Sequence, residues 1–383
     1  MDVILAAGCM LRLFYVLFST IYDRQYDIGM IDLDAGHTVT GGHLAYIQYL
    51  YENWKLPDFD PSVYQFNHPP LHHYLCALWM KLCSLFISNT DVLEESIQVV
   101  PFVCSLLILW FLLQIAEQFE LTEKAKRFVM LLFCFHPALV LLSGSVNNDC
   151  MSLMFTVMCV YYTILWSRFP TAHNILKLAV SIALGMLTKQ SVAQMAFPIA
   201  AVMLWMLVRS LDNGRDCRAR SVESTRNAAI PVVPVKKLLG QYVLFGVVSI
   251  PLGMSFYIRN RIQFHMPLVW IYTLPEDSWQ YTGNVPVLNR FLFPVPSEML
   301  DNLRQFKLGC GYNVWMQIIR TSVLGEWDMA DVGRSVKVLA VLLMLVGALL
   351  ALAALMAFIR VFVVRAKRFG IDSASRTLFV VGY

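Results

Sequence analysis

Residues 98–117 read QVVPFVCSLLILWFLLQIAE, and this stretch decides the fold class. Its only charged residue is Glu117, at the end of the run. A run of about 20 apolar residues is long enough to cross a hydrocarbon core of ~30 Å as a helix. Backbone polar groups inside lipid must be paired within the segment, so such a run is expected to be helical. The stretch therefore predicts a membrane-spanning helix.

Comparable runs occur along the whole chain, which is 58% hydrophobic and 15% charged, with a mean hydropathy of +0.59. This composition is too apolar for a soluble protein of 383 residues. We expect an all-α polytopic membrane protein. The last run is cut off by the end of the sequence, so the chain is expected to be a C-terminally truncated piece of a longer protein. Spans are predicted near residues 2–22, 98–117, 126–145, 150–167, 174–190, 192–210, 239–258 and 337–363, with another starting near Thr377.

The charged residues indicate how the chain is oriented in the membrane, and they do not indicate binding to nucleic acid. The formal net charge is only +4, and the basic residues cluster between apolar runs instead of forming a continuous nucleic-acid surface. We therefore expect membrane lipid, and no nucleic acid, as a partner. The nine cysteines show neither a disulfide framework nor zinc-ligand spacing.

Residues 71–88 decide the sidedness, because they are apolar but short and contain Lys81. If they lie along the membrane or dip into it, the basic loops after the second, fourth, sixth and eighth spans share one side. Basic loops are cytoplasmic by the positive-inside rule. The opposite, extracytoplasmic side then carries residues 23–97, the turns near 147–149 and 188–191, and the loop 259–336. The membrane is the plasma membrane in a bacterium and the endoplasmic reticulum in a eukaryote.

This topology divides the chain into five parts. The first span (1–22) precedes an extracytoplasmic catalytic loop with juxtamembrane helices (23–97) and a bundle of five spans (98–210). A cytoplasmic linker (211–238) then leads to the spans that flank the long external loop (239–383).

Four aspartates follow the first span within twelve residues: Asp23, Asp27, Asp32 and Asp34. All four can be solvated interfacial acids. Asp27 differs because Tyr26 and Ile28 give it an apolar setting, where a partly desolvated carboxylate can act as a base.

Two juxtamembrane helices are predicted after these acids. Leu44, Ile47 and Leu50 recur at helical spacing within 43–54, which predicts an amphipathic helix ended by Lys55-Leu56-Pro57. The run His68-Pro69-Pro70-Leu71 predicts the start of another, since prolines suit a first helical turn.

His68 would lie at or just before this second N-terminus, which favours anions such as phosphate. His68 and His72, four residues apart, also suit a divalent-metal pair if Asp27 or Asp149 supplies a third ligand. The alternative is that both are satisfied interfacial histidines without metal.

The remaining candidates lie at span ends. Asp149 follows Asn147-Asn148 and is either a helix N-cap or a functional acid. Lys189 is the only charge between two apolar spans, where isolated charges are costly and indicate function, although a lysine near a helix end also snorkels. Arg12 lies inside the first span, and snorkelling or pairing with another helix explains it as well as catalysis does. Weaker candidates in the long loop are Arg259, Arg261, Glu326 and Trp327.

The order of these motifs resembles that of C-type (GT-C) membrane glycosyltransferases, in particular the protein O-mannosyltransferase and lipid A aminoarabinose transferase branch. The resemblance spans about residues 12–198. It is carried by an acid soon after the first span, Leu56-Pro57, His68-Pro69-Pro70-Leu71, Asn148-Asp149 and Gly185-Met186-Leu187-Thr188-Lys189.

The resemblance implies a GT-C helical bundle and site roles. Asp27 would be the catalytic acid of the first external loop, with Asp34 as the alternative, and Asp149 would be the second acid. Lys189 would lie near the donor phosphate. His68, which stands before Pro69-Pro70, would assist there. Outside the resemblance, the place of Arg259 and Arg261 at the same membrane rim suggests further contacts to the donor phosphate, and Glu326 and Trp327 are candidates for contacts to the acceptor or the loop.

The implied reaction moves a sugar from a polyprenyl-phosphate donor to a hydroxyl of a protein, glycolipid or glycan, with inversion at the anomeric carbon. No resident cofactor is expected, although a divalent metal at His68, His72 and Asp149 stays an alternative. The alternative functions are a transporter or flippase for an anionic substrate and a non-catalytic scaffold subunit.

Overall fold

The computed structural model describes residues 1–21, 42–59, 65–119, 121–216, 233–268, 276, 286–292, 313–324 and 333–369. Within these ranges all regular secondary structure is helical, which confirms the predicted all-α class. The helices form two compact units. The larger contains residues 1–23, 27–135 and 142–270, and the smaller contains 24–26, 136–141 and 271–383.

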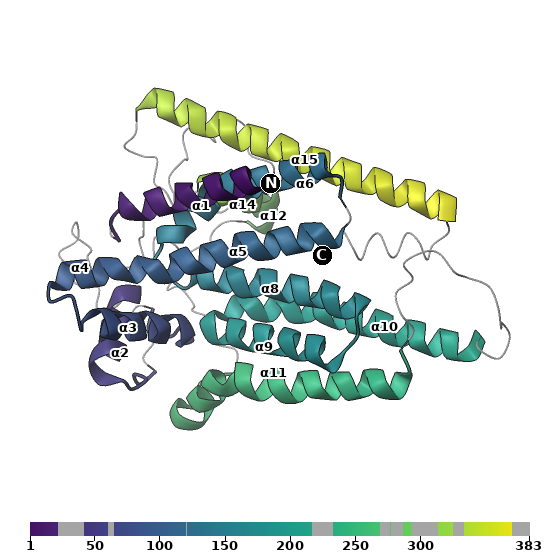
Figure 1. Cartoon of the computed structure of the whole chain (residues 1–383), viewed down its shortest axis with the longest axis horizontal. Coiled ribbons are helices and arrows are strands. Elements are labelled where there is room, and N and C mark those ends of the chain that lie inside the picture. Colours follow the sequence, from purple (N-terminus) through teal and green to yellow (C-terminus); the bar gives the residue numbers. More distant parts are fainter. Residues whose placement is uncertain are drawn as a thin grey trace. The chain divides into compact units, whose positions relative to one another are not determined.

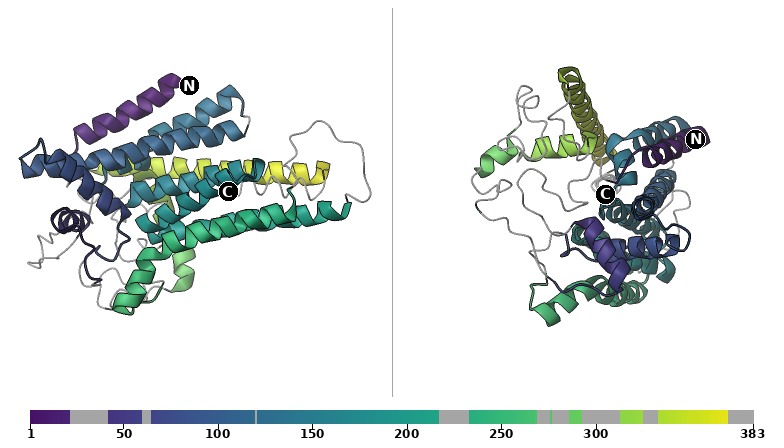
Figure 2. Two further views of the ribbon diagram at one scale, coloured as in Figure 1. Left: turned by 60° about the horizontal axis from the view of Figure 1, so that its bottom comes forward. Right: turned by 90° about the vertical axis from the view of Figure 1, so that its left-hand side faces the viewer.

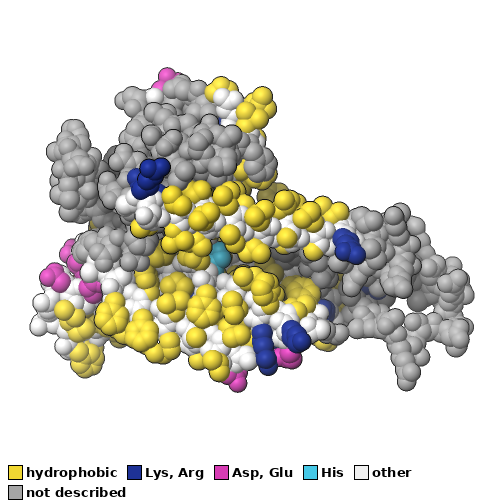
Figure 3. All heavy atoms as spheres, turned by 90° about the horizontal axis from the view of Figure 1, so that it is seen from above, with side chains coloured by type: hydrophobic (Ala, Val, Ile, Leu, Met, Phe, Trp, Pro, Cys, Tyr) yellow, Lys and Arg dark blue, Asp and Glu magenta, His cyan; other side chains and the backbone are white. Residues whose placement is uncertain are grey.

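Among the described residues, five helical segments are long and apolar enough to cross a membrane, so the polytopic prediction is confirmed. A bent pair makes a sixth if it is one span, and the apolar helix α9 is shorter. The five segments are Thr90–Gln118, Asp149–Arg168, Gln190–Leu211, Val235–Phe264 and Arg334–Ala357. Hydrophobic side chains cover the long helices on the face shown in Figure 3, with charged side chains towards their ends.

The larger unit begins with α1 (Asp2–Leu17), which is shorter than the predicted span 2–22. Its juxtamembrane layer consists of α2 (His43–Asn53), α3 (Leu71–Cys83), α4 (Thr90–Glu95) and the 3-10 turn η1 (Ser96–Gln98). Its other helices are α5 (Val99–Gln118), α6 (Glu123–Phe135), η2 (Leu142–Gly144), α8 (Asp149–Arg168), α9 (Ala172–Thr188), η3 (Gln190–Met195), α10 (Ala196–Asp216) and α11 (Val235–Phe264). The smaller unit has α7 (Pro137–Leu141), α12 (Val287–Phe291), α14 (Val314–Leu324) and α15 (Arg334–Phe369).

The predicted span 126–145 is not one continuous helix. The helix α6 ends at Phe135, and a separate helix, α7, begins at Pro137. Proline lacks a backbone N–H, and its ring clashes with the preceding turn, which explains the break. The predicted span 126–145 is therefore interrupted, and it is either one broken span or a re-entrant loop.

The buried guanidinium of Arg12 lies beside the end of α6. It donates to the carbonyls of Cys134 and Phe133, at 2.7 and 3.2 Å, and to Ser105 on α5 at 2.7 Å. Carbonyls near a helix end have no partner within the helix, so the arginine satisfies them. Pairing with other helices therefore accounts for Arg12.

Both predicted juxtamembrane helices are present. Helix α2 buries Leu44, Ile47 and Leu50, the apolar face that the sequence indicates. It ends at Asn53, and the next residue, Trp54, has a left-handed backbone. Helix α3 begins at Leu71 after Pro70 and ends after 13 residues. In the larger unit these two helices lie side by side at one end of α8, α9 and α11 (Figure 1).

Helix α11 runs along the full length of α9. At one end Trp166 donates to Gln241 at 2.7 Å, and Gln241 donates to the carbonyl of Pro170 at 2.9 Å. At the other end Tyr257 donates to the carbonyl of Met186 at 3.1 Å. The views in Figure 2 show the same side-by-side course. The end of α9 and the last two turns of α11 therefore share one end of the larger unit.

Candidate active site

Asp149 and Lys189 form an ion pair between Oδ1 and Nζ, although 40 positions separate them in the chain. Asp149 is the first residue of α8, and its N–H donates to Oδ1 of Asn147 at 3.1 Å. Lys189 follows the last residue of α9 in an extended conformation, and its N–H donates to the carbonyl of Gly185 at 2.9 Å. The two side chains are 29% and 28% exposed, so a ligand can reach both.

A second contact lies directly beside this ion pair. Nδ2 of Asn148 donates to the carbonyl of Thr188 at 3.0 Å, and both residues are fully buried. Oδ1 of Asn148 has no hydrogen-bond partner within the described part of the chain. Asn148 thus binds Thr188, and the next residue, Asp149, binds the next one, Lys189. These two contacts fix the backbone that carries Lys189.

Asp149 is not the N-cap of α8, as the alternative prediction had it, but the first residue of the helix. The residue preceding α8 is Asn148, which makes no side-chain capping bond, whereas Asp149 is already helical. A carboxylate in the first turn interacts favourably with the positive end of the helix dipole. The Asp149 carboxylate is therefore held between a helix N-terminus and an ammonium group.

Four histidines cluster where α2 meets the start of α3. Nδ1 of His43 lies 2.8 Å from Nε2 of His73, and the ring of His43 also stacks on that of His68. His72 donates from Nε2 to the carbonyl of Val146 at 3.4 Å, and the sulfur of Cys76 lies beside the same ring. His68 precedes the helix by three residues and stacks within this cluster.

Burial keeps two of these imidazoles neutral. Burial, together with the neighbouring His43, lowers the pKa of His72 to about 3, although the hydrogen bond to Val146 acts in the opposite direction. Burial also lowers the pKa of His73 well below its usual value, with His43, His72 and His68 acting in the same direction. Neutral stacked rings fit a packing role at the base of the juxtamembrane layer.

The suggested metal group His68, His72 and Asp149 is not assembled in the described residues. These contain no cluster of three or more histidine, cysteine or acidic side chains placed to hold a metal ion. The three side chains have other contacts: His68 stacks on His43, His72 faces Val146, and Asp149 pairs with Lys189.

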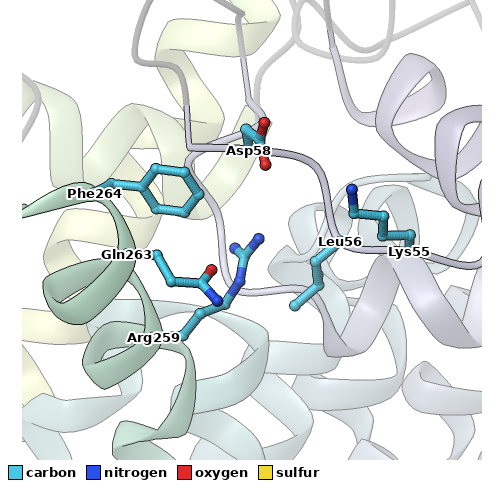
Figure 4. A pocket seen from close by; sticks show the side chains of 6 residues that line it. All are labelled: Lys55, Leu56, Asp58, Arg259, Gln263 and Phe264. Carbon is cyan, nitrogen blue, oxygen red and sulfur yellow. The ribbon is translucent and has the colours of Figure 1, made fainter.

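A pocket of about 440 Å³ lies between the segment after α2 and the last turns of α11. We call it the Arg259 pocket, and Figure 4 shows its lining side chains: Lys55, Leu56, Asp58, Arg259, Gln263 and Phe264. Arg259 donates to the carbonyl of Pro57 at 2.9 Å and to Asn260 at 3.2 Å. Its guanidinium also lies over the ring of Phe264, with the carbon 5.2 Å from the ring centre.

Arg259 belongs to the same end of the larger unit as the ion pair. It follows Tyr257, which bonds to α9 three residues before Lys189. Burial raises the pKa of Tyr46 on α2, and the positive charge of Arg259 acts in the opposite direction. The pKa of Tyr74 on α3 is likewise raised by burial and lowered by the charge of Arg259. The cation therefore faces the juxtamembrane layer that carries Leu56-Pro57.

The other sequence candidates divide into two groups. Arg261 is exposed, donates to the carbonyl of His265 at 3.3 Å, and does not belong to the lining of the Arg259 pocket. Asp27, Asp34, Glu326 and Trp327 lie outside the described residues.

Several residues at this end were not singled out from the sequence. Lys55, Asp58, Gln263 and Phe264 line the pocket, and Asn148 holds the backbone next to Lys189. Two signals were available: Lys55 precedes the Leu56-Pro57 motif, and Gln263 lies four residues after Arg259, on the same helical face.

Comparison with known proteins finds a similarity in the central part of the chain. Residues 67–213 match the family model described as dolichyl-phosphate-mannose-protein mannosyltransferase. The match contains α3, Asn148-Asp149 and Lys189, and it ends before α11. No curated protein and no solved structure gave a significant match to the chain. Over residues 67–213 the chain is therefore similar to the dolichyl-phosphate-mannose-protein mannosyltransferases.

Proposed function

We propose that this chain transfers a sugar from a polyprenyl phosphate to an acceptor hydroxyl, with inversion, at the extracytoplasmic membrane surface. The observation that carries the proposal is the ion pair of Asp149 and Lys189, which stands at one end of the larger unit within the matched segment. An accessible ammonium group at a helix end is suited to the phosphate of a lipid whose tail lies in the membrane.

Lys189 is the donor-phosphate residue in this proposal. Bond breaking between the anomeric carbon and the phosphate oxygen leaves additional negative charge on the lipid phosphate. A preorganised cation stabilises that charge most when it is already oriented in the ground state. Asp149 and the backbone contact from Asn148 supply that orientation.

The attacking acceptor hydroxyl forms the new bond to the anomeric carbon and loses its proton to a carboxylate. Asp27 takes this role by its resemblance to the acid of the first external loop, and Asp34 is the second candidate. A single displacement of this kind inverts the anomeric carbon. General-base catalysis typically contributes about 10²- to 10⁴-fold in rate.

The proposal that the site faces the extracytoplasmic side depends on basic residues at the opposite end of the same helices. Gln241 joins the start of α11 to Pro170, so Arg168, Lys236 and Lys237 lie near that end. Basic residues mark the cytoplasmic side of a membrane protein. Asp149 and Lys189 would then face the extracytoplasmic side.

The test uses purified chain and a radiolabelled dolichyl-phosphate-linked mannose. We expect Asp27→Asn, Asp149→Asn and Lys189→Gln each to lower transfer by about 10²-fold or more while folding and membrane insertion persist. Lys177→Gln is the matched control, because Lys177 lies on the same helix at the other end, over the ring of Tyr162. Full activity in the Asp149 and Lys189 variants would reject the site assignment.

A further inference from the structure

The Arg259 pocket has a lining that the reaction above does not use. Lys55, Asp58 and Gln263 make no hydrogen bond or ion pair within the described part of the chain, and all three are exposed at the pocket. A volume of about 440 Å³ is within the usual range for small-molecule sites, ~300–1,000 Å³. Figure 4 shows the amine of Lys55 and the guanidinium of Arg259 directed towards the same space.

Arg259 is preorganised for an oxyanion. Two of its donors bind the carbonyl of Pro57 and Oδ1 of Asn260, and its carbon lies over the ring of Phe264, so these contacts hold its position before any ligand arrives. A fixed guanidinium with donors to spare recognises carboxylate or phosphate in a defined geometry. Lys55 adds a second, flexible positive charge. Two cations against the single carboxylate of Asp58 leave the pocket with a net positive charge.

The other side chains suit the hydroxyls of a sugar. The carboxylate of Asp58 accepts hydrogen bonds, and the amide of Gln263 both donates and accepts them. The ring of Phe264 offers an apolar surface on the same side of the pocket as Gln263 (Figure 4). An acid, an amide and an aromatic ring next to two cations therefore match a saccharide that carries an anionic group.

The lining also separates this ligand from the lipid-linked donor. A polyprenyl chain beside its phosphate needs an apolar wall, but only Leu56 and Phe264 are apolar among the six lining residues. A hydrophilic ligand fits this lining better. Of the two substrates that sugar transfer requires, the acceptor is the one with such chemistry.

We propose that the Arg259 pocket binds an anionic sugar unit of the acceptor, with Arg259 and Lys55 on its phosphate or carboxylate and with Asp58 and Gln263 on its hydroxyls. The assignment to the acceptor rests on the proposed function. Binding of an anionic sugar does not, since it needs neither Lys189 nor transfer.

The experiment measures binding of glucose 6-phosphate and of neutral glucose to the full chain in lipid nanodiscs, by saturation-transfer NMR. We expect glucose 6-phosphate to bind at least tenfold more tightly than glucose, and the preference to weaken as salt screens the charges. Glucuronate tests whether a carboxylate replaces the phosphate. Gln263→Leu should reduce the affinity for glucose 6-phosphate towards that for inorganic phosphate.

Lys55→Gln and Arg259→Gln should each weaken binding of glucose 6-phosphate at least tenfold. Lys55 is exposed and unpaired in the described structure, so its variant stays informative even if the loss of the Arg259 bond to Pro57 disturbs folding. Arg261→Gln is the matched control, two residues along the same helix and exposed, and it should bind like the wild type.

Three outcomes would overturn the proposal: equal affinity for glucose and glucose 6-phosphate, undiminished binding in both pocket variants, or displacement of the probe by dolichyl phosphate. The last would place the donor phosphate in the pocket. Lys189→Gln should still bind the probe, so a failure of the transfer proposal is distinguishable from a failure of the pocket.

Discussion

Asn148 and Asp149 act on the end of α9 in different ways. Asn148 binds the backbone carbonyl of Thr188, and Asp149 binds the ammonium group of Lys189. The first contact sets where the lysine leaves the chain, and the second sets where its side chain points. A lysine on a flexible four-carbon stem needs both to present its charge at a fixed place.

Replacing Asn148 with Ala should therefore impair transfer without removing any charge. The lost hydrogen bond leaves the buried Thr188 carbonyl unpaired, at a cost of about 1–3 kcal/mol in stability. We expect a lower melting temperature and a reduced kcat as Lys189 loses its position.

Asn174→Ala is the matched control for this prediction. Asn174 donates to the carbonyl of Phe169 at 2.8 Å, at the other end of α9. It should cost a similar amount of stability and leave kcat unchanged. Equal effects of both variants on kcat would show that Asn148 is only a structural residue.

Single residues were predictable from the sequence where their chemistry was conspicuous. Lys189 stood alone between apolar spans, and Asp149 stood at the start of one, so both were identified. Their pairing across 40 positions needed the packing of α8 against α9. The pocket was beyond sequence reasoning, because its two segments are joined by a contact 202 positions long.

At the scale of elements, the end of α9 depends on close packing at Gly185. A Cβ at this position would lie 2.5 Å from Val192 on η3 and 3.0 Å from Phe155 on α8. Valine is stiff at χ1, so it has little freedom to move aside. The absence of a side chain therefore allows η3 to turn back directly after Lys189.

Gly185→Ala should displace η3 and with it the backbone of Lys189. We expect a loss of about 1–3 kcal/mol in stability, as for other overpacked sites, and a reduced transfer rate. Gly246→Ala on α11 is the control, because the nearest atom to its Cβ would be 3.8 Å away. That variant should be neutral or slightly stabilising, since alanine favours helix more than glycine does. Thermal unfolding of both variants in the same detergent makes the comparison.

The buried histidines at the contact between α2 and α3 make the stability of the folded chain depend on pH. His72 has a folded-state pKa of about 3, whereas an unfolded histidine titrates near ~6.5. Between these values the unfolded chain binds a proton that the folded chain does not, so stability falls as the pH drops below ~6.5. Each such histidine contributes at most about 1.4 kcal/mol per pH unit.

The melting temperature should therefore fall between pH 7.5 and pH 5, and His72→Gln should reduce the size of that fall. The exposed His265 provides the control variant, His265→Gln, which should leave the pH dependence unchanged. An identical pH dependence in wild type and His72→Gln would contradict the neutral buried state of His72.

The elements themselves were largely predictable. Apolar runs and the spacing of Leu44, Ile47 and Leu50 located most of the helices, because burial of one face or immersion in lipid dictates the pattern. Helix ends and breaks were harder. The break before Pro137 lies inside the predicted span 126–145, because apolar composition alone does not reveal where a backbone N–H is missing.

At the scale of the whole molecule, composition established the polytopic class, and the distribution of basic loops predicts the sidedness. Two cysteines outside the described residues provide a test of it, Cys217 in the basic linker and Cys310 in the long loop. In cells, a membrane-impermeant maleimide should label Cys310 from the extracytoplasmic side and Cys217 only after permeabilisation. Single-cysteine versions of the chain keep the two signals apart. The reverse labelling pattern would place the candidate site on the cytoplasmic side.

The most direct test of the central claim, that Asp149 and Lys189 have distinct roles in sugar transfer, is the rate of the charge-swapped double variant Asp149→Lys with Lys189→Asp. The swap keeps an ion pair between α8 and α9 but puts the cation on the helix N-terminus and the carboxylate where the donor phosphate would bind. We predict a folded protein whose transfer from dolichyl-phosphate-linked mannose is at least 10²-fold slower than that of the wild type. Wild-type transfer by the swapped variant would contradict the account, because it would show that the pair only joins two helices.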